Sequence, residues 1–131
     1  MTNICYVLDS EGLSRAAARD RLTHARLDRA HQGGARVMTS SMTLIEAHHD
    51  KIPMASWKWM LSRVVVVPVT EDVANDAIEL LRSTGLHGHK YAIDAALAVI
   101  AGRERGHVTV FTSDVDDMTK LCPPHVRIQP V

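Results

Sequence analysis

The sequence is poor in several features that commonly define a class of protein. It has two cysteines, five prolines and 4% aromatic residues in 131 positions. Two cysteines cannot form the disulfide framework of a small secreted domain, so a reducing cytoplasm is the expected compartment. The longest apolar stretches, 64–69 and 95–101, fall far short of the roughly 18 residues of a membrane span. The opening residues, MTNICYVLDS, lack the regions of a signal peptide, and no membrane association is expected.

An excess of charge of either sign is also missing. The chain has 15 Lys and Arg against 15 Asp and Glu. This balance argues against a general electrostatic binder of nucleic acid or membranes, which usually carries a clear basic excess. The balance is nevertheless a cancellation, because residues 1–65 contain nine basic and six acidic residues while residues 66–131 contain six and nine. A role on nucleic acid would therefore depend on a local basic patch.

Several cofactor and nucleophile motifs are absent as well. The sequence has no GxGxxG, no GxxxxGK[ST] and no nucleophile elbow, so nucleotide-cofactor and serine-hydrolase functions have no support. No internal repeat or low-complexity linker divides the chain. With 46% apolar and 23% charged residues, the composition indicates a single globular domain over residues 1–131.

Short apolar runs rich in β-branched residues predict the strands. They lack strict alternation, as is typical of strands buried on both faces of a parallel sheet. The runs are 4–8, 36–38, 64–69, 108–112 and 126–129.

Segments of helical length lie between these runs. Thr70 is a suitable N-cap for a helix that ends near Gly85, and the segment 90–105 is apolar nearly all round, which predicts a buried helix. Another helix is predicted after Pro53 and one over about 14–31. Three residues of the helix after Pro53 are expected in the core, although large Trp and Met side chains also favour interfaces: Met54, Trp57 and Met60. Strands that alternate with helices predict a three-layer α/β/α sandwich around a mostly parallel sheet of four to five strands.

Four carboxylates have positions that suggest a common site. Asp9 and Asp114 follow the first and fourth apolar runs, Glu46 lies in a segment after the second, and Asp94 is the only acid in the apolar run 91–101 of the predicted helix. Because the carboxyl ends of parallel strands line one crevice, we expect these side chains to converge and Glu46 to be partly buried. Converging carboxylates repel one another unless a hard cation such as Mg²⁺ or Mn²⁺ compensates their charge.

Each acid alone also has a structural explanation. Asp9 and Asp114 could cap the helices that follow them. Lys90, four residues before Asp94, could form an ion pair with it. Glu46 could be an ordinary surface acid. The signal is therefore the joint placement of the four.

The motifs VLDS, TLIEA, AIDAALAVIA and VFTSDVDDMTKL resemble the PIN-domain family, and in particular VapC-type toxins of bacterial toxin–antitoxin pairs, over essentially the whole chain. The resemblance implies an endoribonuclease that leaves 5′-phosphate and 3′-hydroxyl ends, a homodimer, and a cognate antitoxin that obstructs the acidic site. It assigns the metal-binding quartet to Asp9, Glu46, Asp94 and Asp114. Asp117 would be an auxiliary acid with Asp116 behind it, and Ser10 and Ser113 would hydrogen-bond the carboxylates or a metal-bound water. The sequence departs from the family by lacking an acid at 89–91 and by having Glu11.

Basic residues near these acids are candidates for contact with RNA. His89 and Lys90 precede Asp94, and we expect them to contact phosphate. Arg15 and Arg19, together with Arg26, fall in a narrow arc if residues 14–31 form one helix, which predicts either a phosphate-tracking stripe or a solvated face. The histidine pairs 48–49 and 87/89 favour surface or RNA-contacting roles over a structural zinc site.

Two other functions fit parts of the pattern. A PIN-like module without cleavage activity would act through protein contacts alone. A receiver-type phospho-acceptor domain also gathers acids around Mg²⁺, but it requires an Asp at the end of its middle strand. Here that strand ends in Pro68, Val69 and Thr70, which counts against a receiver.

Overall fold

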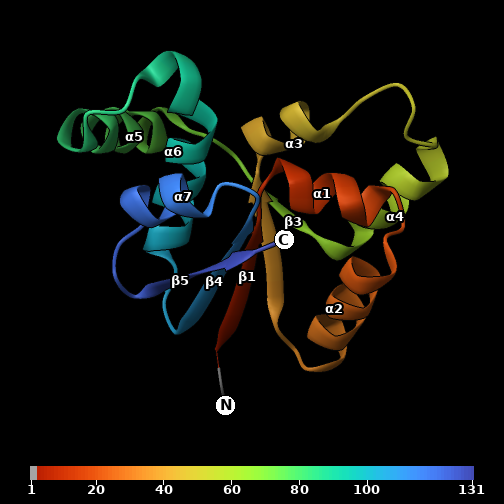
Figure 1. Cartoon of the computed structure of the whole chain (residues 1–131). Helices are drawn as coiled ribbons and strands as arrows, with labels where there is room; N and C mark the ends of the chain where they lie inside the picture. Colours follow the sequence, from red (N-terminus) through yellow and green to blue (C-terminus); the bar gives the residue numbers. More distant parts are fainter. Residues whose placement is uncertain (1–2) are drawn as a thin grey trace.

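The computed structural model describes residues 3–131 and places, within that range, one five-stranded sheet in the middle of the molecule (Figure 1). All neighbouring strands pair in parallel, in the order β3-β2-β1-β4-β5. The strands are β1 (Ile4–Leu8), β2 (Arg36–Ser40), β3 (Val65–Val67), β4 (His107–Thr112) and β5 (Val126–Pro130). All five predicted strands are confirmed, and the sheet is wholly parallel.

The boundaries of two strands differ from the prediction by more than one residue, for identifiable reasons. The strand predicted over 64–69 covers only Val65–Val67. It ends there because Pro68 has no backbone N–H to donate to a neighbouring strand. Strand β2 extends two residues beyond the predicted 36–38 to Ser40. Thr39 and Ser40 are fully buried, but because they are polar, the apolar run that predicts the strand does not include them.

Seven helices in residues 3–131 cover the two faces of the sheet (Figure 1). They are α1 (Ser10–Ala17), α2 (Arg21–Gln32), α3 (Ser41–Ala47), α4 (Met54–Arg63), α5 (Glu71–Thr84), α6 (Gly88–Arg103) and α7 (Val115–Leu121). Helices α5, α6 and α7 lie on one face, and α1, α2 and α4 on the other, which confirms the three-layer α/β/α sandwich. No helix in this part of the chain is both long and apolar enough to cross a membrane.

The ends of α5 follow the predicted local chemistry. The Thr70 hydroxyl accepts a hydrogen bond from the backbone N–H of Val73 at 3.2 Å, and Gly85 ends the helix with a left-handed φ of 72°. Glycine adopts this conformation without steric cost. The predicted start and end of this helix are confirmed.

The prediction of one helix over 14–31 is wrong. The chain forms α1 and α2, which are separated by a turn at residues 18–20. Arg19 has a φ of 60°, which is incompatible with a continuous right-handed helix. The Asp20 side chain then accepts a hydrogen bond from the backbone N–H of Thr23 at 3.0 Å and starts a new helix.

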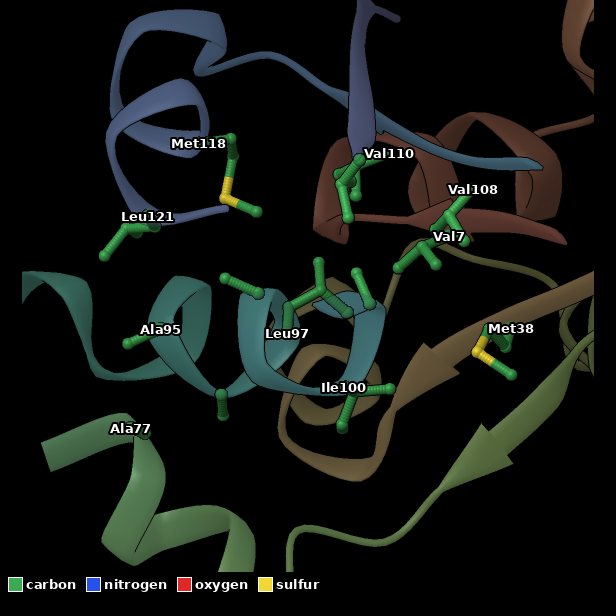
Figure 2. Packing of buried hydrophobic residues seen from close by; sticks show 14 of the residues in the cluster. Val7, Met38, Ala77, Ala95, Leu97, Ile100, Val108, Val110, Met118 and Leu121 are labelled. Atoms are coloured by element: carbon green, nitrogen blue, oxygen red, sulfur yellow. The ribbon is translucent and has the colours of Figure 1, made fainter. Parts of the chain in front are cut away.

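The core on the first face packs α6 against the sheet (Figure 2). Val7, Val108 and Val110 project from β1 and β4, and Leu97 and Ile100 meet them from α6. The predicted burial of this helix is confirmed over Ala95–Ala98. Cys5 belongs to the same core, and burial raises the pKa of its thiol to about 11, so the thiol remains protonated and unreactive near neutral pH.

The core on the second face is smaller and joins α1, α2 and α4 to the sheet. Leu13 from α1 and Trp57 and Met60 from α4 are buried there. Met54 is 59% exposed at the first turn of α4, so its predicted core position is wrong. Helix α4 buries only the face that carries Trp57 and Met60. Met54, its first residue, does not pack against the core.

Candidate metal centre

The topology of the sheet fixes the location of the candidate site. From β1 the chain proceeds to β2 and β3 on one side, whereas β4 and β5 lie on the other. In a parallel sheet, the order of the strands reverses at such a point and the connections diverge, leaving a crevice beyond the carboxyl ends of the two central strands. Leu8 pairs with Phe111, so Asp9, directly after β1, lies level with the end of β4.

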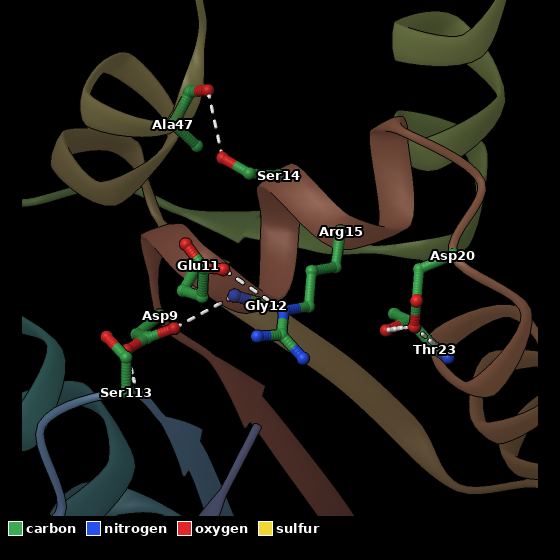
Figure 3. A network of polar contacts seen from close by, with 9 residues as sticks. All are labelled: Asp9, Glu11, Gly12, Ser14, Arg15, Asp20, Thr23, Ala47 and Ser113. Carbon is green, nitrogen blue, oxygen red and sulfur yellow. Dashed lines mark hydrogen bonds and ion pairs between the residues drawn. The ribbon is translucent and has the colours of Figure 1, made fainter.

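Asp9 is buried where the carboxyl ends of β1 and β4 meet, and two backbone N–H groups hold its carboxylate. It is 5% exposed, and its Oδ1 accepts a hydrogen bond from the backbone N–H of Gly12 at 2.9 Å. Its Oδ2 accepts another from the backbone N–H of Ser113, also at 2.9 Å (Figure 3). The capping explanation is thus correct for Asp9, which also ties α1 to the loop after β4. Each carboxylate oxygen retains a further lone pair for another ligand.

Asp114 lies beside Asp9 but is held differently. It occupies the position before α7, where its side chain makes no capping hydrogen bond, so the capping explanation is wrong for this residue. Its backbone N–H donates to the hydroxyl of Thr112 at 2.9 Å. The carboxylate is exposed and free to face the crevice.

Asp94 is the acid that α6 contributes to the candidate site. Burial raises the pKa of Asp94 to about 6, with further contributions from the negative charges of Asp114, Glu46, Asp9 and Asp117. The Lys90–Asp94 ion pair is not formed in the described residues, since the Lys90 ammonium lies 5.2 Å from the centre of the Tyr91 ring instead.

The remaining predicted acids approach from α3 and α7. Glu46 is in the last turn of α3 and is exposed, so the prediction of partial burial is wrong. Asp117 is half-buried in the first turn of α7, while Asp116 beside it is exposed. Both Glu46 and Asp117 raise the pKa of Asp94.

The donor set fits a hard divalent cation. It consists of carboxylate oxygens, which Mg²⁺ and Mn²⁺ prefer, and its mutual repulsion is the kind that a cation relieves. Within residues 3–131, no three His, Cys, Asp or Glu side chains lie close enough together to hold an ion as they are placed. The exposed carboxylates of Asp114 and Glu46 would have to rotate toward Asp9 and Asp94 to bring three ligands within reach of one ion.

Buried hydroxyls that support the crevice were not predicted. The Thr39 hydroxyl donates to the carbonyl of Leu8 at 2.8 Å, next to Asp9. The Ser40 hydroxyl caps α3 by accepting from the backbone N–H of Thr43 at 2.9 Å. The sequence carries a signal for these positions, because a Thr-Ser pair forms the last two residues of β2 and spans the end of β4 at Thr112 and Ser113.

The predicted basic residues do not form a single stripe. Arg15 on α1 pairs with Glu11 at 3.0 Å beside the Asp9 cap (Figure 3). Arg19 lies in the turn after α1, and the narrow arc on one helix is therefore wrong. His89 and Lys90 are exposed in the first turn of α6.

The two serines predicted to support the site differ in their roles. Ser113 contributes its backbone N–H to Asp9 rather than its hydroxyl. Ser10 is the first residue of α1 and is half-buried.

Comparisons with solved structures reveal the kind of fold. One similar chain belongs to the crystal structure of VapBC2 from Rickettsia felis bound to a DNA fragment from their promoter, with a TM-score of 0.72, 18% identity, and coverage of 98% of this chain and 99% of that chain. The chain has a VapC-type PIN fold. A chain of DNA-bound VapBC from Salmonella typhimurium gives a TM-score of 0.68 with 21% identity, covering 99% and 98% of the two chains. No protein-family model and no curated protein matches the sequence. The structural similarity thus confirms the fold that the sequence motifs indicate, at a level of identity where family models and curated proteins give no match.

Proposed function

We propose that this chain is a Mg²⁺- or Mn²⁺-dependent endoribonuclease and the toxin of a toxin–antitoxin pair. One observation carries the proposal. The parallel pairing of β1 and β4 brings Asp9 and Asp114 to one crevice, where Asp94 from α6 is subject to the charges of four other carboxylates. Repulsion between these carboxylates destabilises the folded protein, and a divalent cation bound by a nuclease site would relieve it.

The acidic residues have distinct roles in this proposal. Asp9, fixed by two backbone N–H groups, would hold the ion at a defined position, and Asp94 and Asp114 would complete the ligand set from α6 and the β4 end. Glu46 would bind the ion or orient the attacking water, with Asp117 as an auxiliary acid. When bound, the ion would supply charge compensation and a lowered pKa of its water. The aliphatic residues around Asp94 exclude solvent from one side of the crevice and strengthen these electrostatic interactions.

The partners in the proposal are RNA, a cognate antitoxin and a second copy of the chain. The similar solved structures are VapBC assemblies bound to DNA, which supports an antitoxin partner here. Exposed apolar residues on α3, Met42 and Ile45, supply a surface for self-association. His89 and Lys90, exposed at the start of α6, would contact phosphate beside the crevice.

The test is cleavage of RNA by purified variants. Asp9→Asn and Asp94→Asn should abolish Mg²⁺- or Mn²⁺-dependent cleavage, because each removes one anionic ligand. Asp94→Asn should leave the circular dichroism spectrum unchanged, and it is the decisive variant because Asp9→Asn also loses one acceptor of the two backbone N–H bonds. Asp76→Asn is the matched control, since Asp76 lies exposed on α5 and pairs with Arg103 at 2.6 Å. Wild-type-like cleavage by both site variants would contradict the proposal. A wild-type protein that binds partners but cleaves no RNA with either ion would instead support the non-catalytic PIN-like module.

A further inference from the structure

A groove that the acidic site does not use lies between α2 and the second face of the sheet. Its volume is about 360 Å³, within the range of ligand-binding pockets. The walls come from β1, β4, β5 and α2. Leu22 stands 56% exposed in its lining. The remaining aliphatic residues of the lining include Ile4, Leu8, Leu27 and Ala30.

The charged side chains that line this groove are all positive. Arg26 and Arg29 line it from successive turns of α2, and no Asp or Glu side chain is among its described lining residues. Arg29 is exposed and Arg26 half-buried, and both are without an ion pair among residues 3–131. The groove is therefore complementary to an anionic ligand with apolar surface.

Two aromatic rings form part of the wall. Tyr6 on β1 and Phe111 on β4 meet edge to face with centroids 5.5 Å apart, and both are half-buried. The Arg26 guanidinium lies 5.2 Å from the centre of the Phe111 ring. A guanidinium held over a ring offers its other planar face for stacking and its N–H groups for a phosphate. This combination is typical of surfaces that bind single-stranded nucleic acid.

One end of the groove lies next to Asp9. Leu8 and Gly12 line it, and these residues directly flank Asp9 in the structure, since Asp9 follows Leu8 and accepts the hydrogen bond from Gly12. The backbone carbonyl of Phe111 accepts a hydrogen bond from the backbone N–H of Asp9 at 3.1 Å. A polynucleotide with a phosphate at the carboxylates would therefore have a neighbouring nucleotide at the mouth of the groove.

We propose that this groove binds a nucleotide of single-stranded RNA that flanks the cleavage site, with the base against Phe111 and Arg26 and the backbone phosphate at Arg26 and Arg29. The inference rests on the proposed endoribonuclease function and adds a site that selects and positions the substrate. The groove contributes affinity for RNA independently of the acidic residues and of the metal.

Binding without cleavage tests this inference separately from the catalytic one. The probe is a fluorescein-labelled single-stranded RNA of mixed sequence, and its affinity is measured by anisotropy in EDTA. Arg26→Gln should weaken binding and reduce the slope of log affinity against log salt by about 0.7, the value for one phosphate contact on a single strand. Phe111→Leu, which retains apolar volume, should weaken binding roughly ten-fold through lost stacking. Arg82→Gln is the control, because Arg82 lies exposed on α5 at the opposite face, and it should bind like the wild type.

The outcomes separate the two proposals. Loss of RNA binding by the groove variants supports the groove even if the wild type never cleaves RNA. Wild-type affinity and salt slope in both folded groove variants would overturn it. If the groove variants keep wild-type affinity for RNA but no longer co-purify with the antitoxin, the groove is a protein interface. This outcome also overturns the RNA assignment.

Discussion

At the scale of single residues, Asp94 is held in an environment that opposes its charge. It lies in α6 between apolar neighbours, and burial together with the surrounding carboxylates raises its pKa to about 6. Because the folded protein binds this proton more tightly than the unfolded chain, the ionised form lowers stability. The loss is fully present above pH 6 and disappears as the pH falls toward the ordinary value of 3.8.

Asp94→Asn should therefore stabilise the metal-free protein while abolishing cleavage. At pH 7.5 in EDTA we expect the gain to be on the order of 1 kcal/mol after allowance for partial exposure, which is a rise of a few degrees in Tm. The wild type should approach the variant in stability between about pH 6 and pH 4. Saturating Mg²⁺ should raise the Tm of the wild type more than that of the variant, because binding to the folded state adds stability by linkage. A lower Tm for Asp94→Asn in EDTA would show that the carboxylate is structurally satisfied.

At the scale of secondary-structure elements, α6 is the helix that joins the core to the site. One side packs Leu97 and Ile100 against the valines of β1 and β4, and Asp94 faces the crevice from the same helix. Its other end is linked to α5 by Arg103, which donates to Asp72 at 2.9 Å and to Asp76 at 2.6 Å. All three of these charged side chains are substantially exposed, so the ion pairs are screened by solvent.

Apolar packing rather than these ion pairs should hold α6 in place. Leu97 is fully buried, so Leu97→Ala should lower the free energy of unfolding by about 2–5 kcal/mol. Arg103→Gln should produce a much smaller change. Urea denaturation followed by circular dichroism measures both. An equal loss from the two substitutions would contradict this account of the helix.

At the scale of the whole molecule, one exposed apolar pair offers a surface for the proposed homodimer. Met42 and Ile45 are three residues apart on α3 and therefore neighbours on one helix face, with exposures of 39% and 71%. Ile45 is the most exposed of the large apolar residues in the described chain. An exposed apolar pair beside the acidic Glu46 is suited to an interface that brings two sites together.

Ile45→Lys should convert the proposed homodimer to a monomer. Light scattering after size exclusion should give twice the chain mass for the wild type and the single mass for the variant, because a charge buried in the interface is unfavourable. Met54→Lys, on the exposed start of α4, is the matched control and should remain dimeric. A wild type that is monomeric at micromolar concentration would contradict the dimer, and a dimeric Ile45→Lys would place its interface elsewhere.

Local sequence determined much of this protein. β-Branched runs produced the five strands, Thr70 and Gly85 determined the ends of α5, and the apolar composition of α6 required its burial. Asp9 and Asp114 could be assigned to one crevice because parallel strands align their carboxyl ends. These features depend on backbone propensities, hydrogen-bonding groups close in sequence and the period of apolar residues, all of which are readable along the chain.

Only the tertiary structure decided which of several satisfactory local roles each polar residue takes. Asp9 caps a helix while Asp114 does not, Lys90 leaves Asp94 unpaired, and Arg19 interrupts the expected arginine stripe. The groove beside Phe111 has no sequence signature at all, because its walls come from strands and a helix that are distant along the chain. Sequence specifies the local preferences, but the charges acting on Asp94 and the surfaces that face Arg26 depend on distances through space, and these exist only once the sheet has assembled.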